Sequence, residues 1–214
     1  MQITREQLVD FLRSLHSRPG GTGAILNLIR GSEVRGAADI NLLTDLVSDQ
    51  QAKLDLARHG FDEARHAYVL LRRMNELGFK PFRLPPEVDR VEGLLARCRA
   101  RDVKQVYTDR GRVDDAELME VLVASLIPET DAVGKLQANL EVLEGDPGTR
   151  TVLGGIIRDE QRHVAYLSGW LEKFERRFSP RAVAATRERL EEVFRQLDVT
   201  YYAGLQEYFE RAAA

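Results

Sequence analysis

The nine-residue stretch DEARHAYVL at residues 62–70 returns almost unchanged as DEQRHVAYL at residues 159–167. Both copies carry the frame Asp-Glu-x-Arg-His, although the whole chain has only four histidines. In a helix, residues three positions apart lie about 60° apart around the axis, so the Glu and the His of each copy share a face. The repeat therefore predicts two equivalent helices, each of which presents a Glu and a His to one side.

The apolar residues around these stretches recur at helical spacings, and strand-like alternation is absent. We predict an all-α fold with four long helices at residues 24–47, 50–77, 115–143 and 149–178, arranged as two αα-hairpins. Extra N-terminal, connecting and C-terminal helices are expected at residues 5–14, 86–99 and 180–211. The 214 residues suit a single domain, 1–214, with a core bundle at about 24–178.

The two predicted hairpins repeat each other in the position of a glutamate. Glu33 precedes Glu63 by 30 residues, and Glu129 precedes Glu160 by 31 residues. Each pair lies at similar distances from the turn that joins its two helices. The two glutamates of each pair are therefore expected to face each other across their antiparallel hairpin.

Each of the four predicted long helices has an apolar stripe along one face. Every stripe carries a glutamate near its middle, and two of the stripes carry a histidine one turn later. Four buried carboxylates are prohibitive unless something compensates their charge. Protonation could do so, and so could arginines, although Arg73 is the only arginine on these stripes; two divalent cations do so most simply. A Glu from two helices and a Glu-x-x-His from two others is the di-metal carboxylate pattern of helix bundles. Oxygen and imidazole ligands suit iron or manganese. The candidate ligands are Glu33, Glu63, His66, Glu129, Glu160 and His163.

With these six residues the chain resembles the ferritin-like di-iron carboxylate superfamily over residues 24–178. The resemblance implies that Glu33, Glu63 and His66 hold one iron ion and that Glu129, Glu160 and His163 hold the other, with one or two glutamates bridging. It also implies dioxygen as the co-substrate, a small organic substrate, and a reductase or ferredoxin as a possible electron donor.

Two functions remain open within this resemblance: an O2-dependent oxygenase or oxidase, and a ferroxidase or iron-storage subunit. Segments 78–114 and 180–211 favour the enzyme, because a minimal ferroxidase bundle does not need them. Residues 158–174 also resemble the matching helix of aldehyde-deformylating oxygenases. A manganese catalase is a third option, and a metal-free interaction protein would leave the buried glutamates unexplained.

Several neighbours of the six ligands are further candidates. Metal-bound histidines usually donate their second N–H to a carboxylate, so Asp159 is expected to orient His66 and Asp62 to orient His163. His59 shares the stripe of Glu63 and could be a third imidazole ligand or a hydrogen-bonded core residue. Tyr68 and Tyr166 follow the two ligand histidines and could be redox-active neighbours or ordinary packing residues.

The composition excludes other classes of protein. The net charge of −3 and the absence of a basic stripe argue against nucleic acid as a partner. No apolar run is long enough to span a membrane, and the N-terminus lacks the apolar core of a signal peptide. A lone cysteine, Cys98, fits a reducing compartment. We therefore expect a cytoplasmic monomer or homodimer.

Overall fold

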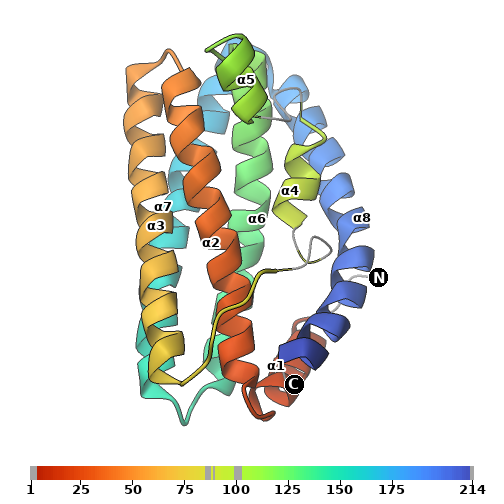
Figure 1. Ribbon diagram of the computed structural model, residues 1–214. Coiled ribbons are helices and arrows are strands. Elements are labelled where there is room, and N and C mark those ends of the chain that lie inside the picture. Colours follow the sequence, from red (N-terminus) through yellow and green to blue (C-terminus); the bar gives the residue numbers. More distant parts are fainter. Residues whose placement is uncertain (1–3, 85–87, 89, 99–102, 213–214) are drawn as a thin grey trace.

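The computed structural model describes residues 4–84, 88, 90–98 and 103–212, and its four long helices form an antiparallel bundle. Helices α2 (Gly21–Leu46) and α3 (Gln50–Glu76) make one hairpin. Helices α6 (Asp115–Val142) and α7 (Pro147–Arg177) make the other and lie behind the first in Figure 1. The predicted all-α architecture of two αα-hairpins is confirmed, with helix ends within three residues of those expected.

Aspartate side chains start three of the four long helices. Asp49, Asp114 and Asp146 each accept a hydrogen bond from a backbone N–H of the first helical turn. These bonds satisfy donors that have no partner within the helix. The fourth helix, α2, instead follows Gly20, which adopts a left-handed conformation with φ 71°. The sequence thus sets where each helix begins, and hence the height of each glutamate in the bundle.

We expect Asp114→Ala to lower the free energy of unfolding by about 1 kcal/mol. Asp114 Oδ1 accepts from the N–H groups of Ala116 and Glu117 at 2.9 and 2.8 Å, and Glu117 Oε2 accepts from the Asp114 N–H at 2.9 Å. Urea denaturation of the metal-free protein measures the loss. Asp10→Ala, which removes an exposed carboxylate on another helix, is the control. Equal stability of the two variants would contradict this assignment.

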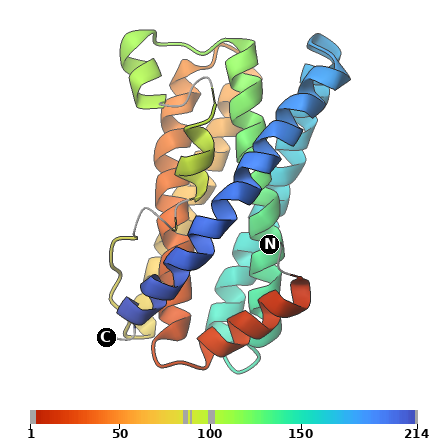
Figure 2. The same cartoon turned by 90° about the vertical axis from the view of Figure 1, so that its right-hand side faces the viewer.

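Four further helices cover one side of the bundle. They are α1 (Arg5–His16), α4 (Arg90–Leu95), α5 (Val103–Asp109) and α8 (Pro180–Ala212). Figure 2 shows α8 crossing this side diagonally, with α4 beneath it and α1 at one end. The connecting helix predicted at 86–99 is shorter, and residues 86, 87, 89 and 99 lie outside the described part. The sequence did not predict α5, whose seven residues are too few for a clear periodic pattern.

The core consists of apolar layers above and below a polar band. In α3, α6 and α7 a buried leucine lies seven residues before the glutamate and another lies seven residues after it. Seven residues are about two helical turns, so both leucines share the face of the glutamate. These residues are Leu56, Leu70, Leu122, Leu136, Leu153 and Leu167. The glutamates are therefore enclosed at both ends by hydrocarbon, which lowers the local dielectric constant.

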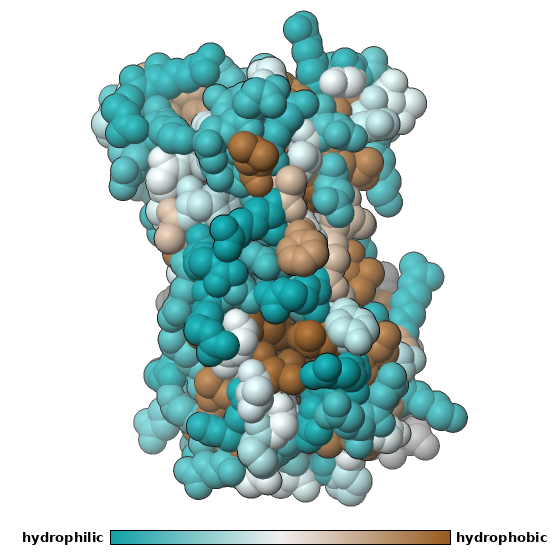
Figure 3. Space-filling model, turned by 90° about the vertical axis from the view of Figure 1, so that its left-hand side faces the viewer, coloured by the Kyte–Doolittle hydropathy of each residue, from teal (hydrophilic) through white to brown (hydrophobic). Residues whose placement is uncertain are grey.

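The outer surface of the bundle is mainly hydrophilic. Figure 3 looks onto the α3 side and shows polar residues interrupted by apolar side chains. Leu54 and Phe61 on α3 are among the exposed apolar residues. Within the described residues, no helix combines the length and apolarity that crossing a membrane requires.

Candidate metal centre

Seven ionisable side chains from all four bundle helices meet in the polar band. Glu33 comes from α2 and Glu129 from α6, whereas α3 and α7 supply both a glutamate and a histidine each, and α3 adds His59. All seven side chains are at most 14 % exposed. The structure therefore brings together the six ligands that the sequence suggested, and it places His59 with them. The set is Glu33, His59, Glu63, His66, Glu129, Glu160 and His163.

One half of the cluster surrounds His66. Its Nδ1 atom lies 2.9 Å from Glu33 Oε2, 3.1 Å from Glu160 Oε1 and 3.8 Å from Glu63 Oε1. One atom from each of these four residues lies within 4.8 Å of the others. Four potential ligands from three helices thus surround a single point.

The other half surrounds His163 and His59. His163 Nδ1 lies 3.0 Å from Glu160 Oε2, 3.6 Å from Glu63 Oε1 and 3.7 Å from Glu129 Oε2. His59 Nε2 lies 3.1 Å from Glu129 and 3.4 Å from Glu63. Glu63 therefore belongs to both halves, and Glu160 contacts a histidine of each. These two carboxylates thus connect the two halves of the cluster.

The environment of Glu63 fits a bound cation. Among the described residues no donor makes a hydrogen bond to Glu63 Oε1, although this atom is buried. Its nearest imidazole nitrogens, on His59, His163 and His66, are 3.4, 3.6 and 3.8 Å away. Two ligands about 2.1 Å from one ion are separated by about 3.0–3.4 Å, depending on the angle between them. The oxygen and nitrogen donors are therefore arranged around positions that metal ions would fill.

Gly36 allows Glu63 to approach α2. A Cβ atom at this position would lie only 2.6 Å from Glu63 Oε2. Gly36 follows Glu33 by one helical turn, which is the position that a histidine takes in α3 and α7. A side chain there would push Glu63 away from the centre. The glycine therefore contributes to the geometry of the carboxylates.

The pKa values show how unfavourable four buried carboxylates are. Burial raises the pKa of Glu63 well above its usual value, and the charges of Glu33, Glu129 and Glu160 raise it further. Burial and the Glu129 charge raise the pKa of Glu160 to about 8. Burial tends to raise the pKa of Glu129 too, but hydrogen bonds with Glu160 and the imidazoles outweigh it and hold the value low. Some of the four carboxyl groups therefore retain protons unless cations are present.

The ligand histidines respond in the opposite direction. Burial lowers the pKa of His66, but hydrogen bonds to Glu160 and Glu33 outweigh it and raise the value to about 10. The pKa of His163 rises to about 9, because hydrogen bonds to Glu129 and Glu160 outweigh burial. Without metal, protonated imidazoles balance part of the negative charge of the cluster, and protons on carboxyl groups remove the rest.

The repeated Asp and Arg of the two motifs form a ring beside the centre. Arg65 and Arg162 each contact both Asp62 and Asp159, so the four side chains join α3 to α7. Sequence reasoning missed the role of these arginines, although their identical place in both motif copies was a signal for it. The repeat is thereby explained: Glu and His face inward, while Asp and Arg tie the two helices together.

The same aspartates lie next to the Nε2 atoms of His66 and His163, on the side of each ring that points away from the glutamates. Asp159 Oδ2 lies 3.1 Å from His66 Nε2. Asp62 Oδ2 lies 3.5 Å from His163 Nε2, a longer contact without a hydrogen bond. Each carboxylate lies where it would accept the outer N–H of its imidazole once a metal ion displaces the proton on Nδ1.

Of the two tyrosines, only one lies near the cluster. The Tyr166 hydroxyl is 2.6 Å from His59 Nδ1, and burial raises its pKa well above the usual value. The suggestion that Tyr68 neighbours the centre is wrong, since its side chain is 62 % exposed. Two residues past His66, it lies about 200° around α3 and therefore points outward.

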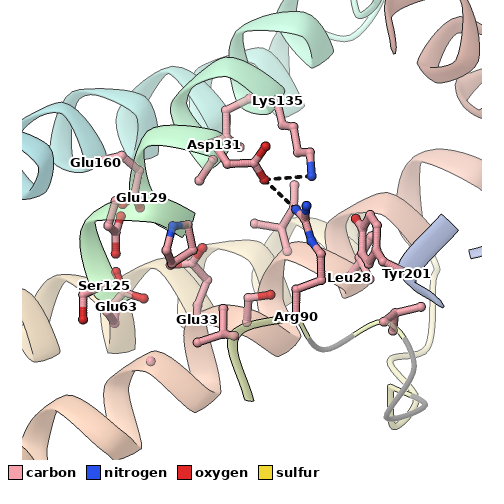
Figure 4. A pocket seen from close by; sticks show the side chains of 18 of the residues that line it. Leu28, Glu33, Glu63, Arg90, Ser125, Glu129, Asp131, Lys135, Glu160 and Tyr201 are labelled. Atoms are coloured by element: carbon pink, nitrogen blue, oxygen red, sulfur yellow. Dashed lines mark hydrogen bonds and ion pairs between the residues drawn. The ribbon is translucent and has the colours of Figure 1, made fainter. Parts of the chain in front are cut away.

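A cavity of about 230 Å³ opens directly beside the cluster. Its wall includes His59 and the four glutamates and then continues between α1, α2, α6 and α8. Figure 4 shows the glutamates at one side of this space. Much of the remaining wall is apolar and includes Leu28, Ile40, Leu136, Phe194 and Leu205. The cavity connects the candidate metal centre with a space suited to a small organic molecule.

Comparison with known families agrees with the fold. A family model described as the ferritin-like domain matches residues 50–177, which is more than half of the chain. The chain therefore belongs to the ferritin-like family. The matched range holds α3, α6 and α7, whereas α2 with Glu33 lies outside it. No curated protein and no solved structure matches the chain.

Proposed function

We propose that this protein is a di-iron oxidoreductase that uses dioxygen to oxidise or oxygenate a small organic molecule. The apolar cavity beside the glutamates carries this proposal. An iron-storage subunit needs only a path for hydrated ions, and hydrocarbon walls disfavour such ions. An enzyme for organic molecules needs an apolar space next to its reactive centre.

The donor set assigns the ligands to two metal positions. Glu33, Glu63, His66 and Glu160 would hold one ion, and His59, Glu63, Glu129 and His163 would hold the other. Two bound iron ions, or manganese ions in their place, would supply the electrons that reduce dioxygen. A reductase or ferredoxin would return the electrons that this chemistry consumes.

The protein contributes orientation and exclusion of water. Asp159 and Asp62 would hold the metal-bound imidazoles with a proton on the outer nitrogen and with Nδ1 turned to the metal. Tyr166 accepts the Nδ1–H of His59 when Nε2 binds metal. The leucine layers keep bulk water away, which strengthens the attraction between the carboxylates and the cations. The Asp–Arg ring would preserve the spacing of α3 and α7 when the charge of the metal centre changes.

We expect the purified chain to bind about two iron ions when it is reconstituted anaerobically with Fe(II). Elemental analysis after removal of free iron gives the ratio, and addition of oxygen should produce a new near-ultraviolet or visible absorption band. Binding of no metal would contradict the proposed function. Uptake of many irons per chain would indicate iron storage instead, and preferential retention of manganese would identify that metal as the working ion.

A further inference from the structure

An apolar stripe runs along the outside of α3. Leu54, Phe61 and Tyr68 follow one another at intervals of seven residues, so they lie on one side of the helix. Their side chains are 67, 66 and 62 % exposed. Ala57 and Ala64 are also exposed and take the intermediate positions of the same stripe. Figure 3 looks onto this face, and the proposed function gives these residues no role.

The stripe lies on the uncovered side of the bundle. Helices α1, α4, α5 and α8 cover the other side, and Figure 1 shows α3 at the edge of the molecule opposite α8. Single exposed apolar residues are common on proteins, but apolar residues that adjoin one another within a polar surround are typical of interfaces. The stripe therefore indicates a surface that another molecule covers.

Arginines border the stripe on the side of α7. Arg58 and Arg65 come from α3, whereas Arg158 and Arg162 come from α7. Arg65 and Arg162 are balanced by the two aspartates of the Asp–Arg ring. Arg58 and Arg158 are exposed, and within the described part of the chain neither side chain makes an ion pair or a hydrogen bond. The border of the stripe is therefore positively charged.

The acidic residues of the same part of α3 point elsewhere. Asp62 and Glu63 are buried, and Asp55 accepts a hydrogen bond from Trp170 Nε1 of α7 at 2.9 Å. The face thus combines an apolar centre with a basic rim, and the matching surface has an apolar centre and an acidic rim. A second copy of the same face does not match, because the contact would place arginines against arginines.

Short contacts connect this face with the ligand cluster. The Arg65 side chain is 37 % exposed and contacts Asp159 beneath it. Asp159 Oδ2 in turn lies 3.1 Å from Nε2 of the candidate ligand His66. Only one carboxylate therefore separates a surface arginine from the candidate metal centre. A molecule docked here would lie close to the centre without entering the cavity between α1, α2, α6 and α8.

We propose that this face docks an acidic protein that carries electrons one at a time. The inference rests on the proposed function, which consumes electrons, and it adds the chemical nature of the donor and the place where it binds. Each docked carrier passes one electron to the centre, so two reduced carriers convert two Fe(III) ions to Fe(II) and leave as two oxidised carriers. The substrate can occupy the cavity at the same time, because the two surfaces lie on different sides of the bundle.

Titration calorimetry of the iron-reconstituted protein tests the inference with two acidic carriers, a plant-type ferredoxin and a flavodoxin. We expect binding at low salt that weakens as salt is added, because screening reduces the attraction between exposed charges. Combined Arg58→Glu and Arg158→Glu substitutions should weaken binding at least about ten-fold, since they reverse the rim charge. Phe61→Ser should have an effect of similar size, because it removes the apolar centre. Arg181→Glu, which reverses an exposed charge on α8, should leave the affinity unchanged.

Reduction kinetics give a second measurement. The oxidised iron-loaded protein is mixed with a reduced carrier or with dithionite, a small donor that needs no docking surface. Phe61→Ser should slow reduction by the carrier about ten-fold and leave reduction by dithionite unchanged. An equal loss with both donors would overturn the proposal, because the substitution would then act on the centre and not on docking.

Two further results would overturn it. One is that neither carrier binds, or that binding is unaffected by the reversal of Arg58 and Arg158. The other is a dimer of the parent chain that becomes monomeric in Phe61→Ser on sedimentation, since a second copy would then cover the face. Iron content is measured on the same samples. Iron without carrier binding refutes only the docking surface, whereas carrier binding without iron refutes the proposed function.

Discussion

Glu63→Ala is expected to abolish stable binding of both metal ions, so that iron per chain falls from about two to well below one. Glu63 lies in both groups of potential ligands, and its Oε1 atom faces three imidazoles without a hydrogen bond. Loss of a residue that only orients a ligand typically weakens metal binding 10–100-fold. Loss of a carboxylate shared by two ions should therefore cost more than about 100-fold.

Although Glu63 is expected to be needed for metal binding, its charge should destabilise the metal-free protein. We expect metal-free Glu63→Gln, which keeps the side-chain volume, to be more stable towards urea than the metal-free parent. The reason is that Glu63 is buried among three other carboxylates, which raise its pKa. Glu120→Gln is a matched control, because Glu120 is also buried but pairs with Arg189 outside the centre. That variant should retain about two irons and lose stability.

Two results would contradict this account of Glu63. If Glu63→Ala retained both irons, the shared carboxylate would not be a ligand. If metal-free Glu63→Gln lost stability as Glu120→Gln does, the cluster would be a satisfied polar network rather than a site arranged for cations. Measuring iron content and urea stability on each variant distinguishes these cases.

The bundle and the ligand cluster could be predicted because they depend on local spacing. A glutamate with leucines seven residues on either side identifies its own helix face, as in α3, α6 and α7. Capping residues such as Asp114 mark the helix starts, so equal distances from a turn bring side chains to equal height. The position of Glu33 followed from this reasoning alone, outside the range that the family model matches.

The cavity beside the cluster could not be predicted in the same way. Arg90 begins a helix of only six residues, and its aromatic neighbours come from α8, more than 100 residues later. No periodic pattern links Arg90, Lys135 and Tyr201, because tertiary packing alone brings them together. Tyr68 differs for another reason: two residues are about 200° around a helix, so a side chain next to His66 in sequence points away from it in space.

We expect the metal-free protein to lose stability steadily as the pH rises from 7 to 9. His66 and His163 have folded pKa values of about 10 and 9, whereas an unfolded histidine releases its proton near pH 6.5. Glu160, with a folded pKa of about 8, likewise keeps a proton that the unfolded chain releases near pH 4.5. The folded state therefore holds more protons in this window, and its stability decreases as they leave.

Asp159 and His59 also have shifted pKa values, but they do not affect stability between pH 7 and 9. The low pKa of Asp159, about 2, affects stability only in acid, and the lowered pKa of His59 acts below about pH 6.5. Each proton held only by the folded state changes the free energy of unfolding by about 1.4 kcal/mol per pH unit. His163→Gln should flatten the dependence by about one proton. His16→Gln, at a histidine outside the centre with a lowered pKa, should leave it unchanged.

Bound metal should reverse this pH dependence, because the ions can bind only to unprotonated imidazoles and ionised carboxylates. Urea denaturation at pH 7, 8 and 9, with and without iron, measures both curves. A gap between them that widens with pH would show that protons and cations compete for the same seven side chains. Parallel curves would mean that the iron binds elsewhere, since the protons of His66 and His163 would then be unaffected by it.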